Sequence, residues 1–481
     1  MILLAISAWL WPAVTVAYFV AILAVAWIIV IDNGNPVRSL GWIAVVVLLP
    51  VLGFLMYLFL GRGLKNTRVI SRRKRRRLAA TSEHSPVPRV VKSLSPDSAR
   101  LIRLGHATTG AGFFPDTPVE VYNDGESFFT ALVADLRAAR ECINMQYYIF
   151  ADDNIGTTIA DILIEKAREG LKVRLLYDYV GCLDVPSKFF SRMADAGVEV
   201  EPFFKPAFPR LASTLNRRNH RKGVMIDNVI GYIGGMNVAD RYINGGDSFG
   251  TWRDTSVKFT GSAVAGLQYH FAVDWNFMGR GIFEYNTVES TDSWPGAIAG
   301  VGVQFITGGP TDRYSGLALT YFKAIAQAKK RVYIQTPYFL PNTAMLSALM
   351  TASLAGVDVR VMLPSMTDSH LLAYASRSFM AECMGAGIKF YLYEPGMLHC
   401  KVMVVDDEFS TVGTTNFDYR SMETNFEENV MMYSREMNRS IASQFEEDMR
   451  LSKRVMPREW HRRSRGEKIR ESVCRLLSPM L

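Results

Sequence analysis

The 481-residue sequence contains only five cysteines, and no two of them form a CxxC pair. An odd, scattered set of this kind supports neither a disulfide framework nor a zinc site of the usual spacing. We therefore expect free thiols in a reducing compartment, with no zinc site and no disulfide framework. No cofactor is expected.

Charged residues are missing from two stretches near the N-terminus, Met1 to Ile31 and Ser39 to Leu60. About 20 apolar residues are enough for a helix to cross the hydrocarbon of a bilayer, and both stretches reach that length. A cleavable signal peptide would have a basic start and a shorter apolar run. We therefore predict a two-helix transmembrane hairpin over residues 1–61; a signal peptide and buried core helices are the alternatives.

Acidic residues are missing from residues 62–77, which contain nine Lys or Arg. A basic cluster beside a membrane helix marks the cytoplasmic side and is attracted to anionic lipid. We therefore predict that the region after the hairpin is cytoplasmic. The cluster either binds lipid or acts only as a topology signal in a linker, which extends through a Ser- and Pro-rich stretch to residue 98.

The long middle of the chain carries a net negative charge. The whole chain carries +8, and removing the +9 of residues 62–77 and the +6 of Lys453 to Arg475 leaves about −7 for residues 78–452. A nucleic-acid-binding domain would have a basic footprint, so no nucleic acid partner is expected. The tail of residues 453–481 fits either an amphipathic helix on the bilayer or an ordinary solvated helix.

The remaining sequence contains two segments with the same order of elements. One begins at AARECINMQYYIF (138–150) and the other at AKKRVYIQTPYFL (328–340). Each continues through an amphipathic stretch and a β-rich run to an Ala-Gly pair and a short strand, which predicts βαβ units and a mainly parallel sheet. We place two α/β halves at residues 99–300 and 301–452. The alternative is that any two α/β segments share this pattern.

The pattern HxKxxxxD occurs in both halves, and each copy is followed by a glycine turn and an asparagine. These residues are His220, Lys222, Asp227 and Asn237 in the first half and His399, Lys401, Asp406 and Asn416 in the second. The apolar run after each lysine ends in a turn, so each motif is predicted to form a β-hairpin. The sequence has only seven histidines, which makes this duplication a specific signal.

The residue types in these motifs suit chemistry on a phosphate. Positions i and i+2 of an extended strand point to the same face, so each His and Lys project into one cleft. An imidazole acts as a nucleophile or a proton donor near neutral pH, and an ammonium binds phosphate oxygens. Two such pairs supply both halves of a double displacement without a metal, because the lysines and asparagines offset the developing charge.

The paired motifs resemble those of the phospholipase D superfamily, and the rest of the chain is similar to the bacterial cardiolipin synthases. The resemblance extends over nearly the whole sequence, through NPVRSLGWIAVVVLLPVLGFLMYLFLGR, MQYYIF, TWRDTSVKFTG, TPYFLP, DSHLLAYASRS, NFEENV and the C-terminal RLLSPML. It implies two pseudo-symmetric α/β/α halves in one globular unit, with the motifs meeting at a pseudo-twofold interface.

The resemblance also implies an activity. Two phosphatidylglycerol molecules would give cardiolipin and glycerol at the inner membrane, with His220 as the nucleophile that forms a phosphatidyl-histidine and His399 as the acid and base. Only the resemblance assigns the nucleophile to the first half, and the reverse assignment of the two roles stays open. An acid downstream of each His, Asp254 in WRD and Glu427 in NFEE, would orient the imidazole. Many relatives have GSxN where this chain has GGMN and GTTN, so a hydroxyl that could bind phosphate is absent at Gly235.

Three other functions fit parts of the sequence. A phospholipase D would transfer the same lipid to water or another alcohol, because acceptor choice depends on water exclusion and pocket shape. A membrane-anchored nuclease conflicts with the negative charge of residues 78–452. A silent membrane scaffold conflicts with the intact motifs in both halves.

Overall fold

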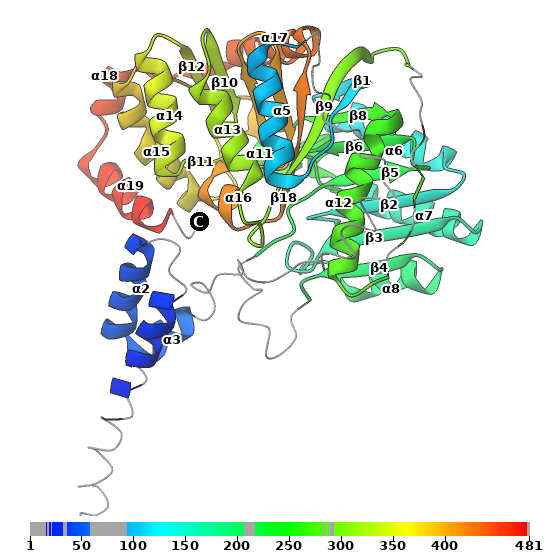
Figure 1. Ribbon diagram of the computed structural model, residues 1–481, viewed down its shortest axis with the longest axis horizontal. Coiled ribbons are helices and arrows are strands. Elements are labelled where there is room, and N and C mark those ends of the chain that lie inside the picture. Colours follow the sequence, from blue (N-terminus) through cyan, green and yellow to red (C-terminus); the bar gives the residue numbers. More distant parts are fainter. Residues whose placement is uncertain are drawn as a thin grey trace, which may run out of the picture. The chain divides into compact units, whose positions relative to one another are not determined.

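The computed structural model describes residues 16, 19–20, 22–31, 36–57, 94–205, 217–281, 283, 285–286, 288 and 293–478 (Figure 1). The chain divides into two compact units. One contains the N-terminal helices, and the other contains residues 68–205 and 218–481. The basic stretch of residues 62–77 and most of the predicted linker lie outside the described residues.

The described part of the N-terminal unit is a helical hairpin. Residues 22–31 form one helix, and α2 (Pro36–Leu48) and α3 (Pro50–Met56) follow. Val25 and Ile29 of the first helix are buried in one cluster with Trp42, Val46 and Tyr57. These described residues therefore pack on one another, and most of Met1 to Val20, the first part of the predicted transmembrane hairpin, lies outside the described residues.

The second apolar stretch is not one continuous helix. The charge-free stretch from Ser39 to Leu60 was predicted to supply the second helix of the hairpin, but α2 ends at Leu48 and α3 begins at Pro50. Leu49 has φ −131° and ψ 70°, because a proline disfavours helical geometry in the residue before it. Among the described residues, no helix combines the length and the apolar composition needed to cross a bilayer.

The larger unit is built on a single 15-stranded sheet. Its first half contains α5 (Pro96–Thr109), β1 (Phe114–Tyr122), α6 (Gly125–Ala138), β2 (Cys142–Tyr147), α7 (Asn154–Arg168), β3 (Lys172–Asp178), α8 (Ser187–Asp195), β4 (Glu199–Phe203), β5 (Gly223–Ile226), β6 (Ile230–Gly234), α10 (Arg241–Asn244), α11 (Gly246–Phe249), β7 (Thr251–Arg253), β8 (Ser256–Thr260), the short 3-10 helix η2 (Gly261–Ala263) and α12 (Val264–Phe277).

The second half repeats this order. It contains β9 (Ile298–Gly308), α13 (Gly316–Ala326), β10 (Arg331–Gln335), β11 (Phe339–Leu340), α14 (Thr343–Leu354), β12 (Asp358–Pro364), α15 (His370–Gly385), β13 (Lys389–Tyr393), β14 (Gly396–Leu398), β15 (Val402–Val405), β16 (Phe409–Gly413), β17 (Phe417–Asp418), α16 (Tyr419–Glu423), β18 (Glu427–Tyr433), α17 (Arg435–Arg450), β19 (Ser452–Arg454), α18 (Pro457–His461) and α19 (Arg465–Leu477).

The sheet has a pseudo-twofold axis at its centre. There β1 pairs with β9 in antiparallel register, and Phe114 lies opposite Val303. Outward from this pair the strands run β8, β6, β5, β2, β3, β4 on one side and β18, β16, β15, β10, β12, β13, β19 on the other. The predicted duplication is therefore confirmed, and both halves share one sheet.

The prediction of a mainly parallel sheet was wrong. Only β2, β3 and β4, and correspondingly β10, β12 and β13, are parallel neighbours. The other pairs in the large sheet are antiparallel, because short turns join β5 to β6 and β15 to β16. A parallel neighbour needs a long crossover, which only the helices α7, α8, α14 and α15 provide.

Helices cover both faces of the sheet, as expected for α/β/α halves (Figure 1). One face packs against α6, α7 and α8 in the first half and against α5, α13, α14 and α15 in the second. The opposite face carries α12 and α17, whose apolar residues join strands of both halves in one core. Equivalent helices of the two halves are capped in the same way. Asp153 is the N-cap of α7 and Asn342 is the N-cap of α14, and each side chain accepts a hydrogen bond from a backbone N–H of the first turn.

The C-terminal tail belongs to the folded unit. β19 pairs with β13 at the sheet edge, so the second half extends past the predicted boundary at residue 452. α19 lies on α15, where Cys474 is buried and Arg475 pairs with Glu382 at 2.8 Å. One face of α19 is therefore a packing surface.

Candidate active site

Each motif histidine is fixed by the backbone of the opposite half. β14, which ends one residue before His399, pairs in parallel with β7, which ends one residue before Asp254. The His399 N–H donates to the Arg253 carbonyl at 2.7 Å. In the other half the His220 N–H donates to the Phe426 carbonyl at 2.9 Å. Each motif therefore lies against the segment that carries the acid of the other repeat.

This pairing crosses the carboxylates between the halves. His220 Nδ1 lies 2.9 Å from Glu427 Oε2, and His399 Nδ1 lies 2.7 Å from Asp254 Oδ2. Both carboxylates are fully buried. The resemblance implied that these acids orient the imidazoles, and each lies within hydrogen-bond distance of an Nδ1 atom. The acid that serves each histidine, however, comes from the other half.

A carboxylate at Nδ1 fixes the tautomer of an imidazole. The Nδ1–H donates to the carboxylate, so Nε2 presents its lone pair on the other side of the ring. His220 and His399 both line one cavity of about 600 Å³. The site therefore holds two oriented imidazoles that face a shared space.

The two motif lysines are buried beside the histidines. Lys222 Nζ donates to the His220 carbonyl at 2.7 Å, and Lys401 Nζ lies 3.5 Å from Asp254 Oδ2. Lys222 is 3% exposed and Lys401 is 1% exposed. Burying an ammonium this deeply is unfavourable unless an anion balances it, which indicates a site made for a negatively charged group.

The pKa values of these groups reflect burial and the crossed pairing. Burial lowers the pKa of Lys222 to about 7, with Lys401 acting in the same direction and Glu427 opposing both. Burial and the nearby Lys401 charge lower the pKa of His399 to about 4. Burial also lowers the pKa of His220, against the attraction of Glu427. Burial therefore favours the neutral form of both imidazoles.

The two carboxylates remain ionised despite being buried. Burial alone would raise the pKa of Asp254, but Lys401 and the hydrogen bond from His399 outweigh it and lower that pKa. The pKa of Glu427 is lowered in the same way by His220 and Lys222. Each carboxylate therefore stabilises positive charge on its histidine when that charge develops during a reaction.

The cavity lies at the edge of the sheet where active sites of α/β folds usually occur. It is lined by Tyr148 and Val180, which follow β2 and β3, and by Tyr338 and Asp368, which follow β10 and β12. These are the carboxyl ends of the parallel strands. Within the described part of the chain, no group of three or more His, Cys, Asp or Glu side chains is arranged to hold a metal ion.

The two predicted asparagines line this cavity but are held differently. Asn237 accepts from the Ile149 N–H at 3.1 Å and donates to the Tyr242 hydroxyl at 2.5 Å. The amide oxygen of Asn416 is buried and has no hydrogen-bond partner among the described residues. The two asparagines therefore differ in how their amide oxygens are satisfied, although both side chains line the cavity.

The residue after each motif glycine is explained by the carboxylate beside it. A Cβ atom at Gly235 would lie 2.0 Å from Asp254 Oδ1, so no serine fits there without displacing the carboxylate. The equivalent Thr414 donates its hydroxyl to Glu427. The hydroxyl that was predicted to bind phosphate therefore orients a carboxylate in the second half, and its absence in the first half follows from packing.

The motif aspartates lie away from the cavity. Asp227 and Asp406 were predicted in the catalytic set, but neither lines the cavity, and they occupy the turns after β5 and β15 with φ of 52°. Asp227 accepts from the N–H groups of the three residues that lead into β2. Asp406 does the same for the three residues that lead into β10. Their geometry is that of structural residues, which fix each hairpin to the neighbouring strand.

Sequence reasoning missed a second set of buried charges behind the motifs. Arg221 pairs with Asp274 of α12 at 2.8 Å, and Gln146 donates to the same carboxylate. Asp448 on α17 of the second half pairs with Arg253 of the first half at 3.0 Å. The only signal in the sequence was that each arginine is adjacent to a motif residue, in HRK and in WRD.

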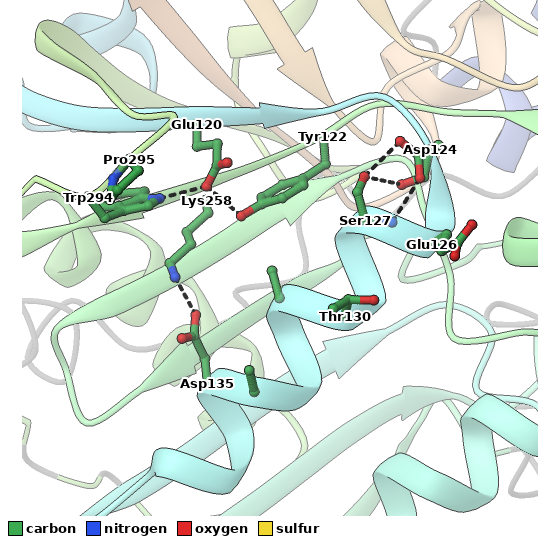
Figure 2. A pocket seen from close by; sticks show the side chains of 12 residues that line it. Glu120, Tyr122, Asp124, Glu126, Ser127, Thr130, Asp135, Lys258, Trp294 and Pro295 are labelled. Carbon is green, nitrogen blue, oxygen red and sulfur yellow. Dashed lines mark hydrogen bonds and ion pairs between the residues drawn. The ribbon is translucent and has the colours of Figure 1, made fainter.

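A second cavity, of about 740 Å³, lies between β1, α6 and β8 (Figure 2). Its charged lining is Glu120, Asp124, Glu126, Asp135 and Lys258. Glu120 accepts from Tyr122 and Trp294, and Lys258 pairs with Asp135 at 2.6 Å. The excess of carboxylates repels a phosphate, so this larger cavity does not compete with the one between the histidines.

Family models match both parts of the chain. A model described as "Cardiolipin synthase, PLD-like domain" matches residues 132–248 and 321–449. A model described as "Phospholipase_D-nuclease N-terminal" matches residues 19–62. Each of the first two matches contains one of the motifs.

Several relatives match over most of their length. Cardiolipin synthase 2 of Bacillus cereus is 37% identical over 462 residues, which cover 94% of this chain and 89% of the relative. The major cardiolipin synthase of Bacillus subtilis is 36% identical, with 92% and 93% covered. A crystal structure of phosphatidylserine synthase from Haemophilus influenzae has a TM-score of 0.59 at 14% identity, covering 79% of this chain and all of that one, which supports the fold alone.

The crossed pairing predicts which variants share a defect. Glu427→Gln should impair the same step as His220→Ala, and Asp254→Asn the same step as His399→Ala. Each carboxylate variant should lower kcat about a hundredfold or more, because its imidazole loses its orientation. Without His220 or Glu427 no covalent adduct should form. Without His399 or Asp254 the adduct should form slowly, because the leaving glycerol is not protonated, and should then persist, because no base activates the acceptor. Rapid-quench trapping of labelled adduct measures this.

Glu428→Gln is the matched control, since Glu428 is adjacent to Glu427 but pairs with His270. It should retain most of its activity per folded molecule. If Glu427→Gln instead shared the defect of His399→Ala, the assignment of partners across the halves would be wrong.

Proposed function

The chain belongs to the cardiolipin synthases of the phospholipase D superfamily, and we propose that it condenses two phosphatidylglycerol molecules into cardiolipin and glycerol. Family membership rests on identities of 36–37% over more than nine tenths of the chain. The observation that supports the mechanism is the single cavity lined by two imidazoles, each held at Nδ1 by a buried carboxylate.

The reaction proceeds by two displacements at one phosphorus. Nε2 of His220 attacks the phosphodiester of the first phosphatidylglycerol, the bond from phosphorus to the glycerol oxygen breaks, and His399 gives its proton to that oxygen. His399 then removes the proton from the terminal hydroxyl of the second phosphatidylglycerol. That oxygen attacks phosphorus and releases His220, so atoms and protons balance over the cycle.

Substrate charge prepares the site for this chemistry. In the empty cavity the pKa of His399 is about 4, mainly because of burial and then Lys401, so the residue is neutral at pH 7. A bound phosphodiester places a negative charge beside Lys401 and both imidazoles, which raises their pKa values. The acid form of His399 is therefore favoured only when the substrate is present.

A phospholipase D that uses water is the second candidate in the same chemical class. The motif residues serve both reactions equally, because the covalent intermediate is the same. Similarity to cardiolipin synthases over more than nine tenths of the chain favours the transferase. The negative charge of residues 78–452 disfavours a nuclease.

The proposal predicts the products and their loss. Full-length protein in phosphatidylglycerol vesicles should form cardiolipin and glycerol in equal amounts, and His220→Ala or His399→Ala should reduce both by at least about a thousandfold. Thin-layer chromatography of labelled lipid separates cardiolipin from phosphatidic acid. Phosphatidic acid as the main product would identify a hydrolase, and near-normal cardiolipin from either variant would refute the double displacement.

The pKa of Lys222 predicts an alkaline limit. Because that pKa is about 7, the ammonium is mostly charged below pH 7 and mostly neutral above it. We therefore expect kcat/KM to fall as the pH rises through about 7, since neutral Lys222 binds the phosphate less well. In Lys222→Arg the guanidinium keeps its proton, so the fall should move to higher pH even if the rate is lower.

Profiles of kcat/KM between pH 5 and 9 test this assignment. Lys330→Arg is the control, because Lys330 is exposed and lies outside the cavity. An alkaline limit that stays at the same pH in Lys222→Arg would assign it to another group.

The membrane is the proposed location, with the larger unit on the cytoplasmic side of a bacterial inner membrane. The N-terminal hairpin exposes large apolar side chains, including Leu23, Trp27 and Leu40, each about two-thirds exposed. An exposed apolar surface of this kind fits hydrocarbon better than water. The basic stretch of residues 62–77 supports the orientation.

α19 offers a further membrane contact. Its Ile469, Val473 and Leu476 are 64%, 54% and 80% exposed and recur at helical spacing, while Lys468 and Arg470 lie among them in the sequence. The opposite side of α19 packs on α15, whose Leu371 and Leu372 line the catalytic cavity. An interfacial α19 would therefore hold the cavity close to the lipid surface.

Replacing Ile469 and Leu476 by Asp should therefore raise the apparent KM for phosphatidylglycerol in mixed micelles by roughly tenfold, from the loss of about 1.5–3 kcal/mol of apolar contact per side chain, part of which the hairpin compensates. The kcat should stay unchanged. Leu354→Asp, at the equally exposed end of α14, is the control. Equal KM values for all three proteins would exclude α19 from the interface.

A further inference from the structure

A basic cavity lies at the corner of the second half where β10 and α17 begin and the β15–β16 turn passes. Its volume is about 340 Å³, within the roughly 300–1,000 Å³ of small-molecule sites. The side chains that line it are Lys330, Arg331, Asp407, Arg435, Asn438 and Arg439. Four of them are basic and one is acidic, a net charge of +3, whereas residues 78–452 as a whole carry about −7. Positive charge is therefore concentrated here against the trend of the surrounding chain.

Hydrogen bonds fix one guanidinium group of this lining to α17. Arg331 donates through Nε to the Asp406 carbonyl at 2.9 Å and through a terminal nitrogen to Asn438 Oδ1 at 3.2 Å. Asn438 is fully buried and donates in turn to the Phe409 carbonyl at 2.7 Å. The Arg331 guanidinium therefore lies against the first turns of α17.

The other two arginines of the cavity belong to those turns. Arg435 and Arg439 are four residues apart on α17, a spacing that places their Cβ atoms about 5–6 Å from each other on one side of the helix. Asn438, which contacts Arg331, is the residue before Arg439. Three guanidinium groups therefore converge on one small cavity.

The carboxylate of the cavity is already paired with a lysine. Asp407 forms an ion pair with Lys330. The hydrogen bond from Lys330 is the main cause that lowers the pKa of Asp407, and the charges of Arg331 and Arg435 lower it further, so both arginines are near this carboxylate. Within the described part of the chain, neither Arg435 nor Arg439 forms an ion pair. One shared carboxylate therefore leaves an excess of positive charge.

α17 adds positive potential at the same corner. It has 16 residues and begins at Arg435, after the N-cap Ser434. The N–H groups of a first helical turn carry a partial positive charge, which favours an anion. Glu436 in this turn is exposed and does not line the cavity. The helix and the arginines therefore favour a ligand of the same sign.

The repeat shows that the fold does not require these arginines. The two halves can be aligned through the N–H groups that the motif aspartates bind and through the ends of β8 and β18. The equivalent residues are Cys142 for Arg331, Ser262 for Arg435 and Gly266 for Arg439. The first half thus builds the same corner without a guanidinium group. A ligand that only the second half binds accounts for the difference.

The cavity lies at the opposite end of β10 from the catalytic cavity. Arg331 is the first residue of β10, and Tyr338, which lines the catalytic cavity, follows its last residue. Five residues of strand span about 16 Å, so the two cavities are separate sites. In the proposed function the catalytic cavity is close to the lipid surface. The basic cavity is therefore reached from the aqueous side.

We propose that Arg331, Arg435 and Arg439 form a binding site for the phosphate monoester group of a soluble ligand, separate from the catalytic site. A guanidinium presents a planar fork of donors that matches two phosphate oxygens, and a phosphate monoester carries about −1.5 to −2 charge at pH 7, enough to balance the cavity. The headgroup of phosphatidic acid has the same chemistry, but the position of the cavity favours the soluble source.

Equilibrium dialysis of the full-length protein in detergent micelles against labelled α-glycerol phosphate measures this binding without reference to activity. Co-sedimentation with phosphatidylcholine vesicles, with and without phosphatidic acid, measures the lipid source. Arg435→Gln/Arg439→Gln is the test variant, and Arg331 is kept because it also holds the β15–β16 turn. Arg168→Gln/Arg450→Gln is the charge-matched control, since both side chains are exposed and line neither cavity.

The test variant should lose one saturable site for α-glycerol phosphate, with affinity at least about ten- to a hundredfold weaker, while any binding in the catalytic cavity remains. Arg435→Lys/Arg439→Lys should keep part of the affinity, and the control should match wild type. Equal Tm values in phosphate-free buffer would confirm that all variants are folded, because only exposed side chains are replaced.

Unchanged binding in the test variant would overturn the proposal. An equal loss in the charge-matched control would also overturn it, because the binding would then be diffuse attraction to the net charge. Arginine-dependent binding that occurs only with phosphatidic acid vesicles would refute the soluble source and assign the cavity to a lipid headgroup.

Discussion

The hydrogen bond between each motif imidazole and a carboxylate of the opposite repeat is the interaction on which the candidate site depends. His220 binds Glu427 and His399 binds Asp254, so neither half contains a complete catalytic unit. The parallel pairing of β14 with β7 holds one contact, and the bridge between Asn219 and Phe426 holds the other. The continuous sheet through β1 and β9 keeps both in register. Both His–carboxylate pairs therefore form only when the two halves pack against each other.

The two repeats have diverged without losing this arrangement. Asp254 has a shorter side chain than Glu427, and the residue beside each carboxylate differs accordingly. Gly235 leaves room for the Asp254 carboxylate, whereas the equivalent Thr414 donates its hydroxyl to Glu427. The buried arginines behind the site also differ, since Arg221 pairs within its own half and Arg253 pairs with the other. Both repeats thus satisfy the same geometric requirement with different residues. Such divergence permits the two histidines to take different roles in one reaction.

The sequence predicted what is local and repeated. The β5–β6 and β15–β16 hairpins follow from apolar runs and turn residues, and the two His-Lys pairs follow from their spacing. The crossing of Asp254 and Glu427 did not follow, because it depends on how the halves pack, and nothing near either residue encodes that. The structural role of Asp227 and Asp406 was missed because the sequence does not distinguish an aspartate that accepts hydrogen bonds from three backbone N–H groups from a catalytic aspartate. Pro50, by contrast, was visible, and its effect on Leu49 needed only the rule for residues before proline.

The buried charges explain why the site is active only with its substrate. Lys222 and Lys401 lie in the protein interior, and their attraction to Glu427 and Asp254 does not fully offset the cost of removing them from water, as the pKa of about 7 for Lys222 indicates. A bound phosphodiester adds negative charge beside these lysines, and the lysines in turn stabilise the phosphodiester. The pentacoordinate state carries still more negative charge on its equatorial oxygens, so the same lysines stabilise it more than the substrate. Because the fold maintains this charge imbalance in the empty site, part of the binding free energy appears as a lower barrier to reaction.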